Sequence, residues 1–255
     1  MNAKLAVLMS GVVCSVGMAA GEIVVRNAQT NDAADIAARR AEWLADCGVA
    51  APVYSVDFES GYTDGQNVSG IPGLFPGGLV ITDTWTTGLA EVRTGRVFGG
   101  SYPNGNFALK HNEKPYLEMR FPGAGVSGFA LSDIDHSGTT LVVHHSDGTT
   151  STFSIETTTT GGVSGEFVGV WRNGRAPIVR VEMDATGDGT WGIDDIQWVP
   201  LCLADLNSDG FVNGDDYDYF ASMFEAGEIG ADINGDTFVN GDDYDAFASA
   251  FEAGC

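Results

Sequence analysis

The stretch DLNSDGFVNGDDYDYFASMFEAG, residues 205–227, decides how this chain is organised, because it occurs twice. Residues 232–254 read DINGDTFVNGDDYDAFASAFEAG, so the copies lie 27 residues apart and are identical at 18 of 23 positions. An internal repeat of this length predicts two copies of one supersecondary unit, neither of which can bury its apolar residues alone. We therefore expect residues 201–255 to form a small helical domain in which the two copies pack on each other.

Each copy begins with twelve residues whose oxygen-bearing side chains recur at fixed places. They stand at the first, third, fifth, ninth and twelfth positions, and the seventh residue can offer its backbone carbonyl. Except that Asp replaces Glu at the end, this is the ligand order of an EF-hand loop, in which Ca²⁺ takes about six to eight oxygen ligands. The predicted ligands of two calcium ions are Asp205, Asn207, Asp209, Phe211, Asn213 and Asp216 in the first loop, and Asp232, Asn234, Asp236, Phe238, Asn240 and Asp243 in the second.

The two loops differ at the sixth position, where such a loop makes its sharp turn. Gly210 occupies this position in the first loop and Thr237 in the second. A β-branched residue resists the backbone angles of the turn, so we expect the second loop to be strained and to bind calcium more weakly.

A short helix is expected after each loop, because apolar residues follow at helical spacing. Two such apolar faces can bury each other. The residues concerned are Tyr217, Phe220, Ala221 and Phe224 in the first copy, and Tyr244, Phe247, Ala248 and Phe251 in the second.

With a loop and a helix repeated twice, and no room for an entering helix, the C-terminal segment resembles a type I dockerin domain. The resemblance covers about a fifth of the chain. It implies folding that depends on calcium, and docking onto a cohesin-like protein or another surface protein. Type I dockerins usually carry Ser or Thr at the tenth and eleventh loop positions, where this chain has Gly214-Asp215 and Gly241-Asp242. The resemblance therefore leaves the docking partner open.

The charge of the chain excludes one class of partner. There are 35 Asp and Glu against 12 Lys and Arg, and the formal net charge is −23. Such a chain has no basic surface with which to neutralise phosphates, which argues against nucleic acid. Residues 203–255 hold 13 of the acidic residues and no Lys or Arg.

Residues 1–20 are expected to be a signal peptide, because Lys4 precedes a short apolar run that ends in small residues. The protein is then secreted or held at the cell surface, and the mature chain has no second apolar run long enough to span a membrane. Export permits disulfides. Removing the signal leaves three cysteines, of which Cys202 and Cys255 bracket the acidic segment and are the expected pair, with Cys47 free.

Residues 52–200 have the alternating pattern of short strands. Turn dipeptides such as Asp64-Gly65 and Asn104-Gly105 separate the strands, which predicts an antiparallel, jelly-roll-like β-sandwich. Residues 21–51 are expected to add one helix within 28–47 that packs on it. The clearest strand segments are 54–58, 78–82, 116–121, 140–145 and 178–183.

Acidic residues near both ends of the sandwich make it similar to exported jelly-roll domains, including carbohydrate-binding modules. The stretches concerned are Val56-Asp57-Phe58-Glu59 and Gly187–Ile196. The similarity implies a third calcium ion, with Glu59 and either Asp194 or Asp195 as ligands. The alternative is that these are ordinary acids of turns and surface. Three tryptophans either stack on sugar rings or belong to the core: Trp85, Trp171 and Trp191.

No motif of an enzyme is evident in the sandwich. There is neither a Gly-x-Ser-x-Gly elbow nor a HExxH motif, and His144 and His145 are neighbours in a strand, so their side chains point to opposite faces. The segment from Asp133 to His136 is expected to be a polar turn. We therefore expect a non-enzymatic sandwich that binds a polysaccharide or a cell-surface component. The alternatives are a small glycan-degrading enzyme (a glycoside hydrolase or a lyase) that carries the docking module, and a structural surface or matrix protein.

Overall fold

A computed structural model describes most of the chain in segments. These are residues 23–28, 33–49, 54–84, 90–94, 107–112, 116–121, 123, 125–134, 139–155, 165–172, 176–184, 190–207, 211–234 and 236–254. The chain divides into two compact units, Met1–Pro200 and Leu201–Cys255. The expected signal peptide, residues 1–20, lies outside the described residues.

The first unit is mainly β structure, and all its strand pairs are antiparallel, which confirms the expected class. Each of the five expected strand segments contains a strand. The described residues form β1 (Ile23–Asn27), β2 (Tyr54–Val56), β3 (Val80–Asp83), β4 (Ala90–Thr94), β5 (Phe107–Asn112), β6 (Tyr116–Arg120), β7 (Val126–Ile134), β8 (Thr139–His145), β9 (Thr150–Ile155), β10 (Gly165–Arg172), β11 (Ile178–Asp184) and β12 (Thr190–Pro200), with a single turn of 3₁₀ helix, η1 (Pro76–Gly78).

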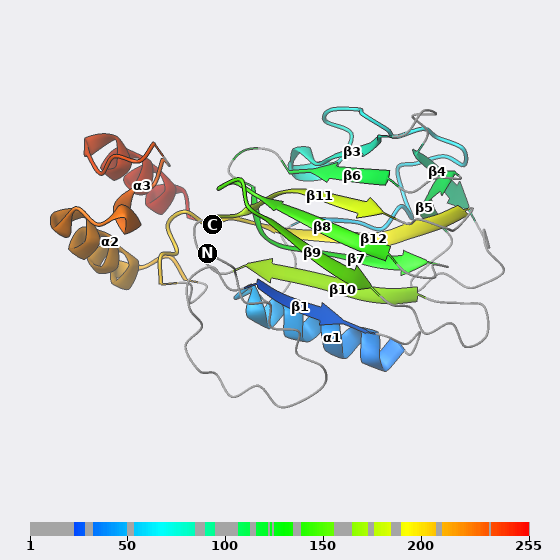
Figure 1. The fold of residues 1–255 in the computed structure, drawn as a ribbon, viewed down its shortest axis with the longest axis horizontal. Coiled ribbons are helices and arrows are strands. Elements are labelled where there is room, and N and C mark those ends of the chain that lie inside the picture. Colours follow the sequence, from blue (N-terminus) through cyan, green and yellow to red (C-terminus); the bar gives the residue numbers. More distant parts are fainter. Residues whose placement is uncertain are drawn as a thin grey trace. The chain divides into compact units, whose positions relative to one another are not determined.

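The strands form one curled sheet with two halves (Figure 1). The half that we call the open half has the order β3-β6-β11-β8-β9. The other half, which we call the helix-side half, has the order β1-β10-β7-β12, and β12 continues to β2 and through β5 to β4. Among the described strands, the two halves pair directly at one residue pair, Ile178 with Val126.

The main core lies between the two halves, because each strand turns alternate side chains toward it. In β6, Leu117 and Met119 are buried in this core, whereas Arg120 is on the opposite face. Phe129 and Trp198 reach the same core from the helix-side half. The other side chains of the open half are therefore left on its outer face, where charged residues such as Arg180 lie beside uncharged ones such as Thr82 and Val142.

Helix α1 (Ala33–Asp46) covers the outer face of the helix-side half, beside β1 and β10 (Figure 1). Trp43 is fully buried there, and its indole Nε1 donates a hydrogen bond to the carbonyl of Val170 at 3.1 Å. The end of the helix is held by Arg26, whose Nε donates to Asp46 Oδ2 at 2.6 Å. The burial of Trp43 depends on Gly169, since a Cβ atom at this position would lie 2.6 Å from Trp43 Cγ.

The second unit contains α2 (Gly214–Ala226), a turn of 3₁₀ helix, η2 (Ile229–Ala231), and α3 (Gly241–Ala253). Phe220 and Phe247 stack at its centre, with ring centroids 4.2 Å apart and both side chains buried. These residues are equivalent in the two copies, so the repeats pack on each other through the same position. No helix among the described residues is long and apolar enough to cross a membrane.

We predict that Gly169→Ala destabilises the first unit, because the added methyl group collides with a fully buried indole. Overpacking of this kind costs about 1–3 kcal/mol of unfolding free energy, measured by urea denaturation followed by tryptophan fluorescence. The control is a double-mutant cycle with Trp43→Ala, which removes the colliding ring. The double variant should therefore lose less unfolding free energy than the sum of the losses in the two single variants. Strict additivity would contradict this account of the contact.

Candidate functional site

The closing aspartates of the two predicted calcium loops are placed alike. Asp216 is completely buried, and its carboxylate accepts backbone N–H groups from Leu206 at 2.9 Å, Asn207 at 3.2 Å and Asn213 at 3.0 Å. A carboxylate offers about four lone-pair sites. Three are used here to tie the end of the loop to its beginning, and capacity remains for a cation.

Asp243 repeats this arrangement in the second copy. It is also completely buried and accepts the N–H groups of Ile233 at 2.8 Å, Asn234 at 3.2 Å and Asn240 at 2.9 Å. Burial alone would raise its pKa, but the N–H groups of Asn240, Asn234 and Ile233 outweigh that effect and hold the pKa below its usual value. The carboxylate is thus kept ionised, as a calcium ligand must be.

The remaining side chains of the second loop also turn into it. Asp232 accepts the N–H groups of Asp236 and Thr237 at 3.1 and 2.9 Å, and Asn234 Oδ1 accepts that of Asp236 at 2.9 Å. In the described residues no set of three or more His, Cys, Asp or Glu side chains is arranged to hold a metal ion. The predicted loop ligands also include Asn side chains and main-chain carbonyls, and Asp209 of the first loop lies outside the described residues.

Thr237 has a positive φ of 76°, so the sixth residue of the second loop does adopt the left-handed conformation that favours glycine. For a β-branched residue this is strained, at a cost on the order of 1–3 kcal/mol. The predicted strain in the second loop is confirmed. Gly210, its counterpart in the first loop, lies outside the described residues.

A second candidate site lies on β12, where a β-bulge interrupts the pairing with β7 between Asp194 and Gln197. Asp194 is opposite Ser132 and both are buried, yet Asp194 Oδ2 and Ser132 Oγ have no hydrogen-bond partner. The same holds for Gln197 Oε1. Buried oxygen atoms without partners cost free energy, and a cation would remove this cost.

The charges around Asp194 would also favour a bound cation. Burial raises the pKa of Asp194 to about 8, the negative charges of Asp195, Glu59 and Asp57 add to the rise, and the N–H of Asp195 opposes it. Burial also raises the pKa of Asp195, although Arg40 Nη2, at 3.1 Å from its carboxylate, partly offsets this. The structure thus brings together the predicted residues Asp194 and Asp195, and the charge of Glu59 acts on Asp194. No local pattern in the sequence marks Ser132 or Gln197 as part of a site.

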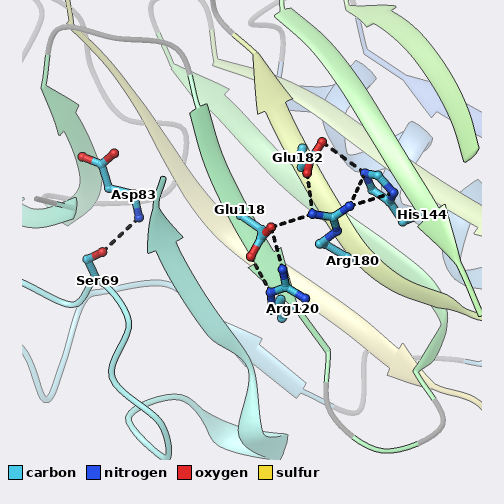
Figure 2. A network of polar contacts seen from close by, with 7 residues as sticks. All are labelled: Ser69, Asp83, Glu118, Arg120, His144, Arg180 and Glu182. Atoms are coloured by element: carbon cyan, nitrogen blue, oxygen red, sulfur yellow. Dashed lines mark hydrogen bonds and ion pairs between the residues drawn. The ribbon is translucent and has the colours of Figure 1, made fainter. Parts of the chain in front are cut away.

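A third candidate site is the outer face of the open half, where five charged or polar side chains form one network (Figure 2). Arg180 is at its centre: its Nη1 contacts Glu118 at 2.8 Å and Glu182 at 2.6 Å, and its Nη2 contacts the ring of His144 at 3.0 Å. Arg120 forms two hydrogen bonds with Glu118. No motif in the sequence marks these residues as a ligand site.

The structure decides one open alternative for the sandwich and corrects one expectation. Trp171 is buried beneath α1, so of its two alternatives a place in the core is confirmed and stacking on a sugar ring is excluded. Asp133 belongs to β7 and not to a turn. Trp85 and the side chain of Trp191 lie outside the described residues. As alternation requires, His144 is on the outer face and His145 is buried, where burial and then Arg172 lower the pKa of His145 to about 4.

The cysteines are in two states. Cys202 is disulfide-bonded, and Cys47 is the free cysteine of the described residues. Cys47 packs near Trp43 behind Gly128, and burial raises the pKa of its thiol. Cys255 lies outside the described residues, so its pairing with Cys202 stays a prediction.

No protein-family model matches the chain, and no curated protein matches it. Among solved structures, the chain is similar to the CBM22-1–GH10 modules of the Clostridium thermocellum xylanase 10B, complexed with xylohexaose. The identity is 12%, the match covers 59% of this chain and 29% of that one, and the TM-score is 0.34.

Two further solved structures are isolated carbohydrate-binding modules. A family 29 module complexed with mannohexaose is 13% identical, over 55% of this chain and 94% of that one, with a TM-score of 0.30. A family 6 module of Clostridium stercorarium, complexed with cellobiose, is 14% identical, over 44% and 95%, with a TM-score of 0.27. All three TM-scores are low, so these likenesses assign neither a family nor a ligand to this chain.

We predict that Thr237→Gly tightens the weaker calcium site by about tenfold or more, because it relieves the strain of the left-handed turn. Calorimetric titration of the full chain with calcium measures both sites, and the tighter one should change little. Ser222→Gly on α2, which lies outside both loops, is the control for a general effect of glycine. If Thr237→Gly weakens binding, the second loop turns by another route.

Proposed function

We propose that this protein is an exported polysaccharide-binding protein whose C-terminal unit is a calcium-dependent docking module of the dockerin type. The observation that carries the proposal is the identical placement of Asp216 and Asp243, each completely buried and each closing its loop through three backbone N–H groups. Two loops with the same oxygen-bearing residues at the calcium positions, and with closing aspartates placed alike, support two calcium sites.

Electrostatics supports a role for calcium in the folding of this unit. Residues 203–255 hold 13 acidic side chains and no Lys or Arg, so the folded unit concentrates negative charge without internal compensation. A unit of about fifty residues buries little apolar surface. Two Ca²⁺ ions cancel four of these charges, and because they bind the folded form, their binding energy adds to its stability.

Exposed apolar side chains support docking onto a protein partner. Of the seven large apolar side chains that are exposed among the described residues, six belong to the second unit. Phe211 and Phe238, at the seventh position of each loop, are 71% and 69% exposed. Exposed apolar groups gathered on one small unit are typical of an interaction surface. The partner is a cohesin-like protein or another surface protein, and a Cys202–Cys255 disulfide would hold the ends of the module together.

The first unit is proposed to bind a polysaccharide, with a third calcium ion as a structural element near Asp194. A raised pKa in a carboxylate also suits a catalytic acid. Asp194, however, is only 1% exposed and cannot reach a substrate, so its environment favours a buried cation over glycan cleavage.

We predict that removing calcium with EGTA abolishes most of the helical circular dichroism of the full chain, and that millimolar calcium restores it. Helices α2 and α3 have 13 residues each, against 14 in α1, so the second unit contributes the larger share of the signal. All five tryptophans precede residue 200, so their fluorescence reports the first unit separately.

The control for this experiment is the double variant Asp216→Ala and Asp243→Ala, which should lack the calcium-induced helicity. Its tryptophan fluorescence should remain that of the folded wild type. Equal helicity of the wild-type protein in EGTA and in calcium would overturn the docking-module proposal.

We further predict that Asp194→Asn removes the calcium-dependent stabilisation of the first unit. An amide keeps the shape of the side chain but loses the charge that would bind the cation, and it lacks the cost of a buried carboxylate. Urea unfolding followed by tryptophan fluorescence, with calcium and with EGTA, measures the effect. The matched control is Asp64→Asn, an acid of an exposed turn. If calcium raises the free energy of unfolding equally in the wild type and in Asp194→Asn, no ion binds at Asp194.

A further inference from the structure

The open half has an outer face that no described element of the first unit covers, in contrast to the helix-side half, whose outer face is packed against α1 (Figure 1). Five side chains of β6, β11 and β8 join there in one hydrogen-bonded network: Glu118, Arg120, Arg180, Glu182 and His144. Stability alone does not account for such a network, since the desolvation of partly buried charges offsets most of their mutual attraction.

The network holds its groups in fixed positions before any ligand arrives. Glu118 has 8% of its side chain exposed and is held by two guanidinium groups, whereas Arg120, on the same strand, is 59% exposed. Figure 2 shows the chain of contacts that runs from Arg120 through Glu118 and Arg180 to His144. Fixed side chains lose little conformational freedom when a ligand binds, which favours affinity.

From these observations we propose that the outer face of the open half binds a neutral, hydroxyl-rich polysaccharide, with Arg120 as its most exposed contact. This inference rests on the proposed function and adds to it the site and the class of glycan.

The chemistry of the face selects this class of ligand. The network offers guanidinium donors beside carboxylate acceptors, and sugar hydroxyls both donate and accept hydrogen bonds. Its two arginines balance its two glutamates, so it is locally neutral in a chain of net charge −23. An anionic glycan would meet both carboxylates of the network and the negative field of the whole protein.

The dimensions of the face fit an extended chain. The open half has five strands, and neighbouring strands lie about 4.8 Å apart, so the face measures about 19 Å from β3 to β9. Thr152 and Ser154 lie exposed on β9, opposite Val142 and Thr140 of β8, and extend the polar surface beyond the network. A linear oligosaccharide would cross several strands and meet polar groups along its length.

The test is calorimetric titration of the full calcium-loaded chain with hexaoses of glucose, xylose and mannose, and with oligogalacturonate as the anionic comparison. Arg120→Ala should weaken binding of a neutral hexaose by about tenfold or more, through the loss of charge-assisted hydrogen bonds. The matched control is Arg93→Ala. Arg93 pairs with Glu91 two residues away, as Arg120 pairs with Glu118, but it lies on β4 in the helix-side half.

Each outcome of the titration decides one part of the proposal. Weaker binding in Arg120→Ala with unchanged binding in Arg93→Ala supports the site, and tryptophan fluorescence confirms that both variants fold. Hexaose binding that Arg120→Ala leaves intact overturns this face as the site but keeps the polysaccharide function. Binding of oligogalacturonate alone overturns the neutral class. If no sugar binds, the polysaccharide part of the proposed function fails as well.

Discussion

A buried carboxylate must be stabilised by hydrogen bonds, by a cation or by a proton, and this constraint governs every candidate site of this acidic chain. Asp216 and Asp243 meet it with three backbone N–H groups each. Glu118 is stabilised by two arginines on the outer face of the open half. Among the described residues Asp194 accepts one hydrogen bond, from the N–H of Asp195, and burial raises its pKa to about 8. The three kinds of site thus satisfy one requirement by different means.

Local features of the fold were readable from the sequence, because they depend on residues that are close along the chain. The repeat predicted the equivalent positions of Phe220 and Phe247, which stack at the centre of the second unit. The alternating pattern predicted strands such as β8, with His144 and His145 on opposite faces. Thr237 predicted a strained turn because position within a loop fixes the backbone angle that is required.

What the sequence could not supply were contacts set by strand register and by covering elements. Ser132 meets Asp194 because β7 pairs with β12 across a bulge, and no local pattern encodes that register over some sixty residues. The pairing of β11 with β6 and β8 likewise places Arg180 between Glu118 and His144. The sequence alone leaves open whether Trp171 is exposed or part of the core, and α1 decides this because it covers that face of the sheet. A single sequence gives periodicity, whereas register is decided by the packing of the whole unit.

The central claim is that the two equivalent loops hold calcium in the folded protein. The most direct measurement is the number of calcium ions that remain with the full chain after equilibrium dialysis, compared with the double variant Asp216→Ala and Asp243→Ala. The account predicts that the variant binds two ions fewer than the wild type. An equal count in both proteins, or no calcium bound to the wild type, would contradict it.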